Sequence, residues 1–395
     1  MSAGVPGHLL PRSDAAPSLR RLQVLYAAMG ASVGSLLPYL VLYLTGRGLS
    51  PTEAGLVLGV MAAVGVVAVP LWGLLADRSL GTVGALRVSS VLAVVGSLVF
   101  LAAGDRLPAV LAAAMLLAAA RAPGDALSDA LTVEVLGDSA TALYGHVRLW
   151  ASIGFAVAVG GWGLLLARTT VDLVLVAYPL MILVVLGCTV GHRWPSTASP
   201  RDTPRVAVRH VLRSGLAVLL GGAMLFGAAM GASSTALPLR LVDIGGGVAA
   251  VAAAAVLGAV AEIPLMRVSG PLSRRVGVPA VLLTGGALFA SSLLLYGLLR
   301  DPLLVVAACL LRGAGYALVY VALVTSVSAL APSGQRATGQ AMLQMTLMGL
   351  APIVGASVGG YGYEHWSALQ LFGAAATIAA LGACLSRLAT LGRPR

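Results

Sequence analysis

The chain has 395 residues, of which 59% are hydrophobic and 10% charged, and its formal net charge is +11. A soluble domain carries roughly 25% charged residues, so this composition excludes a water-soluble globular protein and indicates an integral membrane protein. The positive charge does not indicate binding to nucleic acid, because the 25 basic residues, all arginine, form no cluster on a soluble domain.

Apolar segments long enough to cross a bilayer follow one another along the whole chain. A membrane-spanning helix needs about 20 residues, and each segment reaches that length. We therefore predict an all-α polytopic membrane protein with twelve transmembrane helices, at residues 21–44, 54–76, 83–103, 108–131, 147–168, 171–191, 214–238, 248–268, 278–299, 303–330, 338–361 and 367–388.

One connection, 192–213, is polar and proline-rich, and it separates the sixth and seventh segments. It predicts an N-terminal six-helix bundle at 1–191 and a C-terminal six-helix bundle at 214–395. With this arrangement, 18 arginines lie on the side of the N-terminus and 5 on the other side. The positive-inside rule then predicts that both termini and the connection are cytoplasmic, in an inner or plasma membrane.

The two halves repeat one another. "RAPGDAL" (Arg121–Leu127) is followed 191 residues later by "RGAGYAL" (Arg312–Leu318). Two further pairs, "LLPYLVLYL" with "TALPLRLV" and "GLLADRSLG" with "GPLSRRVG", recur at nearly the same offset and in the same order. Halves with an even number of spans share one topology, so we predict that an axis along the membrane normal relates them.

Three charges in the fourth span, Arg121, Asp125 and Asp129, lie four residues apart and so along one stripe of a helix. Each charge in lipid costs several kcal/mol unless it is paired or hydrated. Either the three satisfy one another, or they line a polar path. Pro123 and Gly124 favour the second interpretation, because broken spans mark binding or gating regions in transporters.

Glu262 is a single carboxyl group about two-thirds of the way along the eighth span. It has two interpretations, a salt bridge to Arg312 on another helix or a site that binds and releases a proton, since lipid favours the neutral form of an acid. The two interpretations are compatible, because a carboxyl group that alternates between pairing with an arginine and holding a proton would couple these two events.

The chain lacks the sequence motifs of several other protein classes. The chain has no GxxxxGK[ST] loop for ATP, and no HExxH or GxGD protease motif. Its three cysteines lie far apart in apolar runs, so we expect no metal site and no cofactor. A polytopic membrane enzyme remains only a remote alternative to a transporter.

With its twelve spans and central connection, the chain resembles the major facilitator superfamily. The residues after the second span carry its signature, a glycine, three residues, then Asp-Arg, as Gly73, Asp77 and Arg78. The resemblance implies two six-helix bundles that rock around one cavity, with these three residues gating its cytoplasmic side. It also implies a protein that functions as a monomer.

"YGHVRLWASIGF" (Tyr144–Phe155) and "AEIPLMRVSGPLSRRVG" (Ala261–Gly277) are similar to the phenylpropionate permease-like and lactose permease-like branch. This implies that Arg148 binds substrate beside a carboxylate on the fourth helix, Asp129 or one within about a turn of it, and Trp150 is the neighbouring candidate. The tenth helix departs from lactose permease by carrying Arg312 and Gly315. Its coupling route and a sugar substrate therefore do not follow.

The sequence thus predicts a secondary transporter, coupled to protons, that imports a small organic or aromatic acid by alternating access. The alternative is a proton-driven exporter of drug-like compounds or secondary metabolites. The partners that we expect are a small-molecule substrate, protons and the lipid bilayer, without nucleic acid. We expect Arg121 and Arg312 to face the cavity from opposite sides, held in the empty state by Asp125 and Asp129 and by Glu262 respectively. The predicted substrate-binding residues are Arg121, Asp125, Asp129, Arg148, Trp150 and Arg312, and the proton-coupling residues are Glu262 and Asp129.

Overall fold

The computed structural model of the chain describes residues 15–137, 140–190, 194, 215–331 and 336–391. All regular secondary structure within these ranges is helical. The predicted connection 192–213 lies outside the described residues except for Trp194.

The first half of the chain forms these helices: α1 (Ala15–Gly46), α2 (Pro51–Leu75), a π-helical turn (Ala76–Leu80), α3 (Gly81–Ala102), α4 (Leu107–Arg121), α5 (Gly124–Leu136), α6 (Ala140–Leu166), a 3₁₀ turn (Val171–Leu173) and α7 (Val174–Thr189). The second half forms α9 (Ala217–Asp243), α10 (Gly247–Val276), α11 (Val278–Leu298), α12 (Pro302–Leu330), α13 (Arg336–Gln344), a π-helical turn (Met345–Leu350), α14 (Ala351–His365) and α15 (Ala368–Thr390).

Eleven stretches of the described chain are long and apolar enough to cross a membrane. One of them, Pro51–Ala102, has 52 residues, roughly 78 Å of helix against a hydrocarbon core of about 30 Å. The chain reverses within it at Gly81, whose φ of 67° suits glycine, so α2 and α3 are separate crossings. The described helices therefore make the twelve predicted crossings.

Helices α1 to α7 pack on one another, and α1 lies at the centre of this group against α6 and α7. The Tyr39 hydroxyl donates to the Val159 carbonyl of α6 at 2.6 Å, and Ser97 of α3 donates to Leu175 of α7 at 2.8 Å. Buried hydroxyl groups thus contribute to the contacts between these helices. We call α1–α7 the N-terminal bundle and α9–α15 the C-terminal bundle.

An equivalent close helix contact occurs in each bundle. In the N-terminal bundle, a Cβ added at Gly154 of α6 would lie 2.0 Å from the Ala27 carbonyl of α1. In the C-terminal bundle, a Cβ added at Gly355 of α14 would lie 2.4 Å from the Ala228 carbonyl of α9. Each member of the second pair follows its counterpart by 201 residues. The sequence repeat therefore extends to the packing of equivalent helices at glycine.

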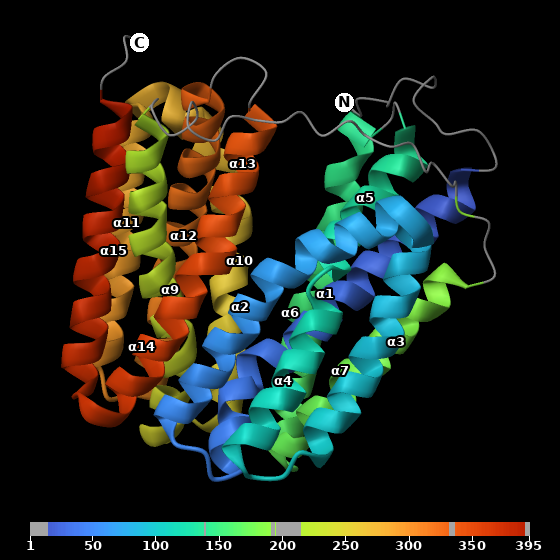
Figure 1. Cartoon of the computed structure of the whole chain (residues 1–395). Helices are drawn as coiled ribbons and strands as arrows, with labels where there is room; N and C mark the ends of the chain where they lie inside the picture. Colours follow the sequence, from blue (N-terminus) through green and yellow to red (C-terminus); the bar gives the residue numbers. More distant parts are fainter. Residues whose placement is uncertain (1–14, 138–139, 191–193, 195–214, 332–335, 392–395) are drawn as a thin grey trace, which may run out of the picture.

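The two bundles meet at one end of the molecule and separate at the other (Figure 1). The end where α15 finishes is the open end, which we call the termini side, and the end where α2 and α14 meet is the far side. The ribbons of the two bundles are thus farthest apart on the termini side.

We expect the termini side to be cytoplasmic. An impermeant thiol reagent added to intact cells should label cysteine placed at Asp105, which is exposed on the far-side loop between α3 and α4. It should leave cysteine at the exposed Ser79, in the π-helical turn after α2, unlabelled until the cells are opened. Labelling of Ser79→Cys from outside would invert this orientation.

Candidate functional site

The fourth membrane crossing is interrupted between α4 and α5. Pro123 has no backbone N–H to donate to the carbonyl of Ala119, four residues earlier. The indole Nε1 of Trp72 on α2 donates to that carbonyl instead, at 2.9 Å. A side chain on a neighbouring helix therefore satisfies the carbonyl that Pro123 leaves free, and it stabilises the direction in which α5 leaves α4.

Replacement of Trp72 tests this contact. Trp72→Phe keeps an aromatic ring but leaves the Ala119 carbonyl without its donor, which costs about 1–3 kcal/mol. We expect the Tm of the purified protein to fall by about 2–6 °C. Trp162→Phe is the matched control, because the Trp162 indole has no hydrogen bond to a described residue. Equal effects of the two changes would show that the Trp72 indole N–H has no such role.

Four side chains of the N-terminal bundle, Tyr26, Asp125, Asp129 and Arg148, form a cluster that we call the N-terminal polar cluster. The Tyr26 hydroxyl of α1 donates to Asp129 Oδ1 at 2.6 Å. The Arg148 guanidinium of α6 lies 5.7 Å from the centre of the Tyr26 ring, a cation–π arrangement. Arg148 Nη1 is 3.9 Å from Asp125 Oδ1. One arginine therefore lies among an aromatic ring and two carboxylates.

This cluster opens toward the space between the bundles. Ala151 and Gly154 of α6 pack on α1, whereas Gly160 and Gly163 of α6 approach α10. Arg148 lies on the strip of the α6 surface between these two contact faces. The side chains of Arg148 and Asp125 are 44% and 62% exposed, although both belong to crossing helices. Such exposure in the middle of a polar cluster indicates a solvent-filled cavity.

The structure brings Arg148 together with a carboxylate of the fourth crossing, as the resemblance implied. The carboxylate at ion-pair distance is Asp125, one turn before Asp129, whereas Asp129 binds the Tyr26 hydroxyl. The expected pairing of Arg121 with these two aspartates differs from the structure, because Arg121 forms no ion pair within the described part of the chain. The break at Pro123 accounts for this, since it interrupts the helical stripe that would align residues four apart.

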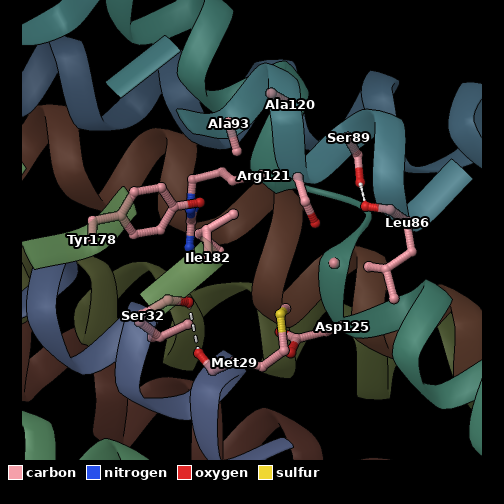
Figure 2. Close-up of a pocket in the computed structure, with 13 residues that line it drawn as sticks. Met29, Ser32, Leu86, Ser89, Ala93, Ala120, Arg121, Asp125, Tyr178 and Ile182 are labelled. Atoms are coloured by element: carbon pink, nitrogen blue, oxygen red, sulfur yellow. Dashed lines mark hydrogen bonds between the residues drawn. The ribbon is translucent and has the colours of Figure 1, made fainter. Parts of the chain in front are cut away.

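Arg121 points into the interior of the N-terminal bundle and not into the space between the bundles. It lines a pocket formed by α1, α3, α7 and the ends of α4 and α5, where its guanidinium approaches the hydroxyl of Tyr178 (Figure 2). Arg121 therefore does not face the C-terminal bundle, contrary to our expectation.

In the C-terminal bundle, Glu262 of α10 lies beside a tyrosine pair of α12. The rings of Tyr316 and Tyr320 stack with centres 5.6 Å apart, and the Tyr320 hydroxyl accepts from Gln344 Nε2 at 2.7 Å. The charge of Glu262 acts on both Tyr316 and Arg312. We call Glu262, Tyr316, Tyr320 and Gln344 the C-terminal polar cluster.

Arg312 lies deeper than this cluster. One of its terminal nitrogens would be 2.4 Å from a Cβ added at Gly258 of α10, and its Nε is buried without a hydrogen-bond partner in the described residues. Tyr296 of α11 and Cys309 are among its electrostatic neighbours. Arg312 thus packs among α10, α11 and α12, with Glu262 near it but beyond ion-pair distance, and it does not face the N-terminal bundle as expected.

Trp150 does not join the N-terminal polar cluster. It is two residues after Arg148, which on a helix turns it by about 200° to the other side of α6. Its side chain is 39% exposed there. Its position is that of an apolar surface residue on a membrane helix, so we leave it out of the proposed site.

Gly73, Asp77 and Arg78 lie at the termini side of α2. Both charged side chains are exposed, and neither forms an ion pair with a residue that the structure describes. A Cβ added at Gly73 would meet nothing within 4 Å. The three residues are therefore free of the other bundle in this state, in which the termini side is open.

The tyrosines of both clusters were not predicted from the sequence, although the repeat held a signal for one of them. Tyr316 occupies in "RGAGYAL" the place that Asp125 has in "RAPGDAL". Each bundle therefore has a polar residue at this position of the repeat. Tyr26 had no such signal, because its partner Asp129 is 103 residues away in the chain.

The far side is closed by two helix pairs that join the bundles, α2 with α14 and α6 with α10. A Cβ added at Gly360 of α14 would lie 2.2 Å from the Pro51 carbonyl of α2. The backbone N–H of Thr52, at the start of α2, donates to Glu364 Oε2 of α14 at 3.0 Å. Backbone contact and a hydrogen bond therefore close the far side while the termini side is open.

Known proteins resemble this chain in sequence. A maltose permease of Geobacillus stearothermophilus is 30% identical over 354 residues, which cover 87% of this chain and 88% of the permease. An uncharacterized transporter, YwbF of Bacillus subtilis, is 26% identical over 88% of this chain and 87% of its own length.

Solved structures share the fold at low sequence identity. A variant of the nucleoside transporter NupG superposes with a TM-score of 0.85 at 16% identity, covering 94% of this chain and 99% of that one. A bacterial homologue of the lysosomal transporter Spinster, solved in an inward-facing and unoccupied conformation, gives a TM-score of 0.73 at 15% identity, over 96% of this chain and 98% of that one.

The sequence profile of the MFS_1 like family matches residues 19–374, most of the chain. The resemblance to the major facilitator superfamily is thereby confirmed, together with the twelve-helix fold that it implied. The maltose permease supports the same assignment through its identity over nearly the full length of both chains. The chain belongs to the MFS_1-like family and is a multi-pass membrane transporter, not an enzyme.

Proposed function

We propose that this transporter imports a neutral, hydroxylated solute, a small saccharide, together with a proton. The observation that carries the proposal is the charge of the cavity wall. Asp125, Asp129 and Glu262 contribute three carboxyl groups, whereas Arg148 is the one arginine of the polar clusters. Arg121 and Arg312 turn into the interiors of their bundles. A wall with this balance of charge repels an anion and suits a neutral ligand.

The chemistry of the two clusters fits a sugar. Sugar hydroxyls both donate and accept hydrogen bonds, and the N-terminal polar cluster offers carboxylate acceptors at Asp125 and Asp129 and a five-donor guanidinium at Arg148. Across the cavity, Gln344 and the rings of Tyr316 and Tyr320 add an amide and apolar faces. The similarity to a maltose permease supports the same substrate class.

A small organic acid, which the sequence analysis placed first, is the second candidate here, and one observation favours it. The Arg148 side chain is 44% exposed, and its distance of 3.9 Å to Asp125 leaves its donors available to a substrate carboxylate. An anionic substrate would have to be accompanied by enough protons to neutralise the excess of carboxylates on the cavity wall. The other alternative is export of drug-like compounds. It differs from the first two candidates, which are both importers, in the direction of transport.

For the proton, we propose Glu262. Glu262 is half-buried on α10. Its side of α10 lies between the face that packs on α12 at Gly258 and the face that approaches α6 at Val256. Arg312 stands near it without pairing to it. Partial burial favours the neutral form of this carboxyl group, whereas the nearby charge of Arg312 favours the ionised form, and a group between two such opposing effects can take up and release a proton.

Transport would then proceed by alternating access. The present state is open on the termini side, and closure of that side would bring Asp77 and Arg78 toward the C-terminal bundle. At the same time the contacts of Gly360 and Glu364 with α2 would have to open. We propose that the protein works in this way as a monomer in the plasma or inner membrane.

Uptake by purified protein in liposomes tests the function. With an acidic exterior, radiolabelled maltose or another small saccharide should accumulate, and a proton ionophore should abolish the accumulation. An aromatic acid, a nucleoside and a lipophilic cation serve as competing substrate classes. Accumulation of the acid without saccharide flux would replace the proposal with the second candidate, and expulsion of the lipophilic cation would indicate an exporter.

Glu262→Gln tests the proton site in the same assay. Glutamine keeps the shape of the side chain but cannot release a proton, so net accumulation should be lost while exchange of internal for external saccharide continues. Glu134→Gln is the matched control, because Glu134 accepts from Thr82 at the termini side of the N-terminal bundle, away from both clusters. Full accumulation by Glu262→Gln would exclude Glu262 as the coupling group.

A further inference from the structure

The N-terminal bundle contains a polar pocket that substrate transport alone does not explain. It is a cavity of about 30 Å³ between α1, α3, α7 and the break of the fourth crossing, and its polar lining consists of Ser32, Ser89, Ser90, Arg121, Asp125 and Tyr178. We call it the arginine pocket. Figure 2 shows Arg121 projecting across it toward Tyr178, with Asp125 on its wall.

The arginine pocket offers acceptors for a guanidinium that has few partners. Ser32 and Ser89 are each 2% exposed, and their hydroxyl protons are directed to carbonyls of their own helices, those of Met29 and Leu86. Their oxygens therefore remain as acceptors facing the pocket. Arg121 forms no ion pair with any residue in the described ranges, although a charge within a membrane helix ordinarily has one.

Asp125 belongs to both polar regions. Its carboxylate lies 3.9 Å from Arg148 on the cavity side, beyond hydrogen-bond distance, and the same residue lines the arginine pocket. The charges of Asp125 and Arg121 both act on Tyr178, which places the carboxylate within electrostatic reach of the pocket. Asp125 also follows Gly124, at the first turn of α5, directly after the break.

From this geometry we infer that Asp125 exchanges arginines during transport, pairing with Arg148 when the cavity is empty and with Arg121 when substrate binds Arg148. The inference rests on the proposed function only for the identity of the substrate. A carboxylate that is displaced from one arginine is stabilised by a second positive charge within reach. Arg121 lines the same small pocket as Asp125 and forms no ion pair with a described residue.

The exchange would link the cavity to the shape of the fourth crossing. Asp125 stands in the first turn of α5, so its movement toward Arg121 would draw the start of α5 toward the end of α4. The absence of a side chain at Gly124 lets the start of α5 lie against the flexible Met29 side chain, because a Cβ there would be 2.5 Å from the Met29 methyl group. Arg121 is then a positioning residue that acts on substrate binding through Asp125, without touching substrate.

A thermal-stability cycle without any substrate tests the exchange. Arg148→Gln imitates the loss of Arg148 to a ligand. In the otherwise native protein, Asp125 should turn to Arg121, so the Tm should fall by only about 2 °C. With Arg121→Gln present, Asp125 has no arginine left, and the same change should lower the Tm by about 5 °C or more. Asp125→Asn should remove this difference, because a neutral amide needs no counter-charge.

Additive effects of Arg148→Gln and Arg121→Gln, or non-additive effects that persist with Asp125→Asn, would overturn the exchange. Binding of maltose, measured by calorimetry, provides the second arm. Arg121→Gln should weaken it about 10-fold in the native background and leave it unchanged beside Asp125→Asn. If the native protein binds no saccharide, the proposed substrate is wrong, while the stability cycle still decides the exchange.

Discussion

Replacement of Arg148 by alanine should weaken saccharide binding by about 10- to 150-fold, the loss that follows removal of a charged hydrogen-bond partner worth about 1.5–3 kcal/mol. Arg148 provides the guanidinium of the N-terminal polar cluster, where it covers the Tyr26 ring and lies 3.9 Å from Asp125. Its loss removes the one positive charge of this cluster, so that Asp129 loses its nearby arginine and Asp125 depends on Arg121. Calorimetry with maltose measures the affinity, and uptake in liposomes should fall with it.

Two controls make this result specific. Arg168→Ala removes an exposed arginine after the end of α6, and Trp150→Ala truncates a side chain on the other side of α6, so both should bind saccharide as the native protein does. Arg148→Lys should restore part of the affinity, because it keeps the charge but loses the planar donor fork. Native binding by Arg148→Ala, or an equal loss in Trp150→Ala, would move the site away from the N-terminal polar cluster.

Replacement of Gly360 by valine should hold the far side open and reduce transport by about 10- to 100-fold, since forcing a side chain into a packed contact costs about 1–3 kcal/mol. A Cβ at Gly360 would lie 2.2 Å from the Pro51 carbonyl and 2.8 Å from the Gly55 Cα. These neighbours are backbone atoms, so α14 and α2 would have to separate. The closed far side, one of the two states of the transport cycle, would be lost.

A reporter cysteine shows this directly. Ser357 lies between α14 and α2, where its Oγ would be 2.6 Å from a Cβ added at Gly59. In a background without the three native cysteines, Ser357→Cys should react with an external thiol reagent more readily when Gly360→Val is present. Gly373→Val is the control, because a Cβ there meets nothing within 4 Å. Protection of Ser357→Cys in the Gly360→Val protein would contradict the closure that we describe.

The fold could be predicted from the sequence because a bilayer requires long apolar helices, and the chain has few polar residues to obscure them. The repeat was also readable, since Arg121 and Arg312 recur with their small neighbours. Helices α2 and α3 follow each other without a gap in helical structure, and only the reversal at Gly81 separates the two crossings.

The candidate site was only partly predictable, because the direction of a side chain depends on packing that the sequence does not state. The four-residue spacing of Arg121, Asp125 and Asp129 suggested one polar stripe on a continuous helix. Pro123 interrupts that helix, so Arg121 turns into its bundle and Asp125 meets Arg148. Nearness in sequence likewise made Trp150 a candidate, although two residues along a helix point to different sides.

The central claim is that one movement of this protein carries a saccharide and a proton together, and proton movement driven by the sugar tests it most directly. Liposomes with the purified protein and an internal pH dye are prepared without a pH gradient, and maltose is added outside. We predict that the interior acidifies with the native protein and that the signal disappears with Glu262→Gln. Entry of radiolabelled maltose without any change in internal pH, or acidification that is unaltered by Glu262→Gln, would contradict the account.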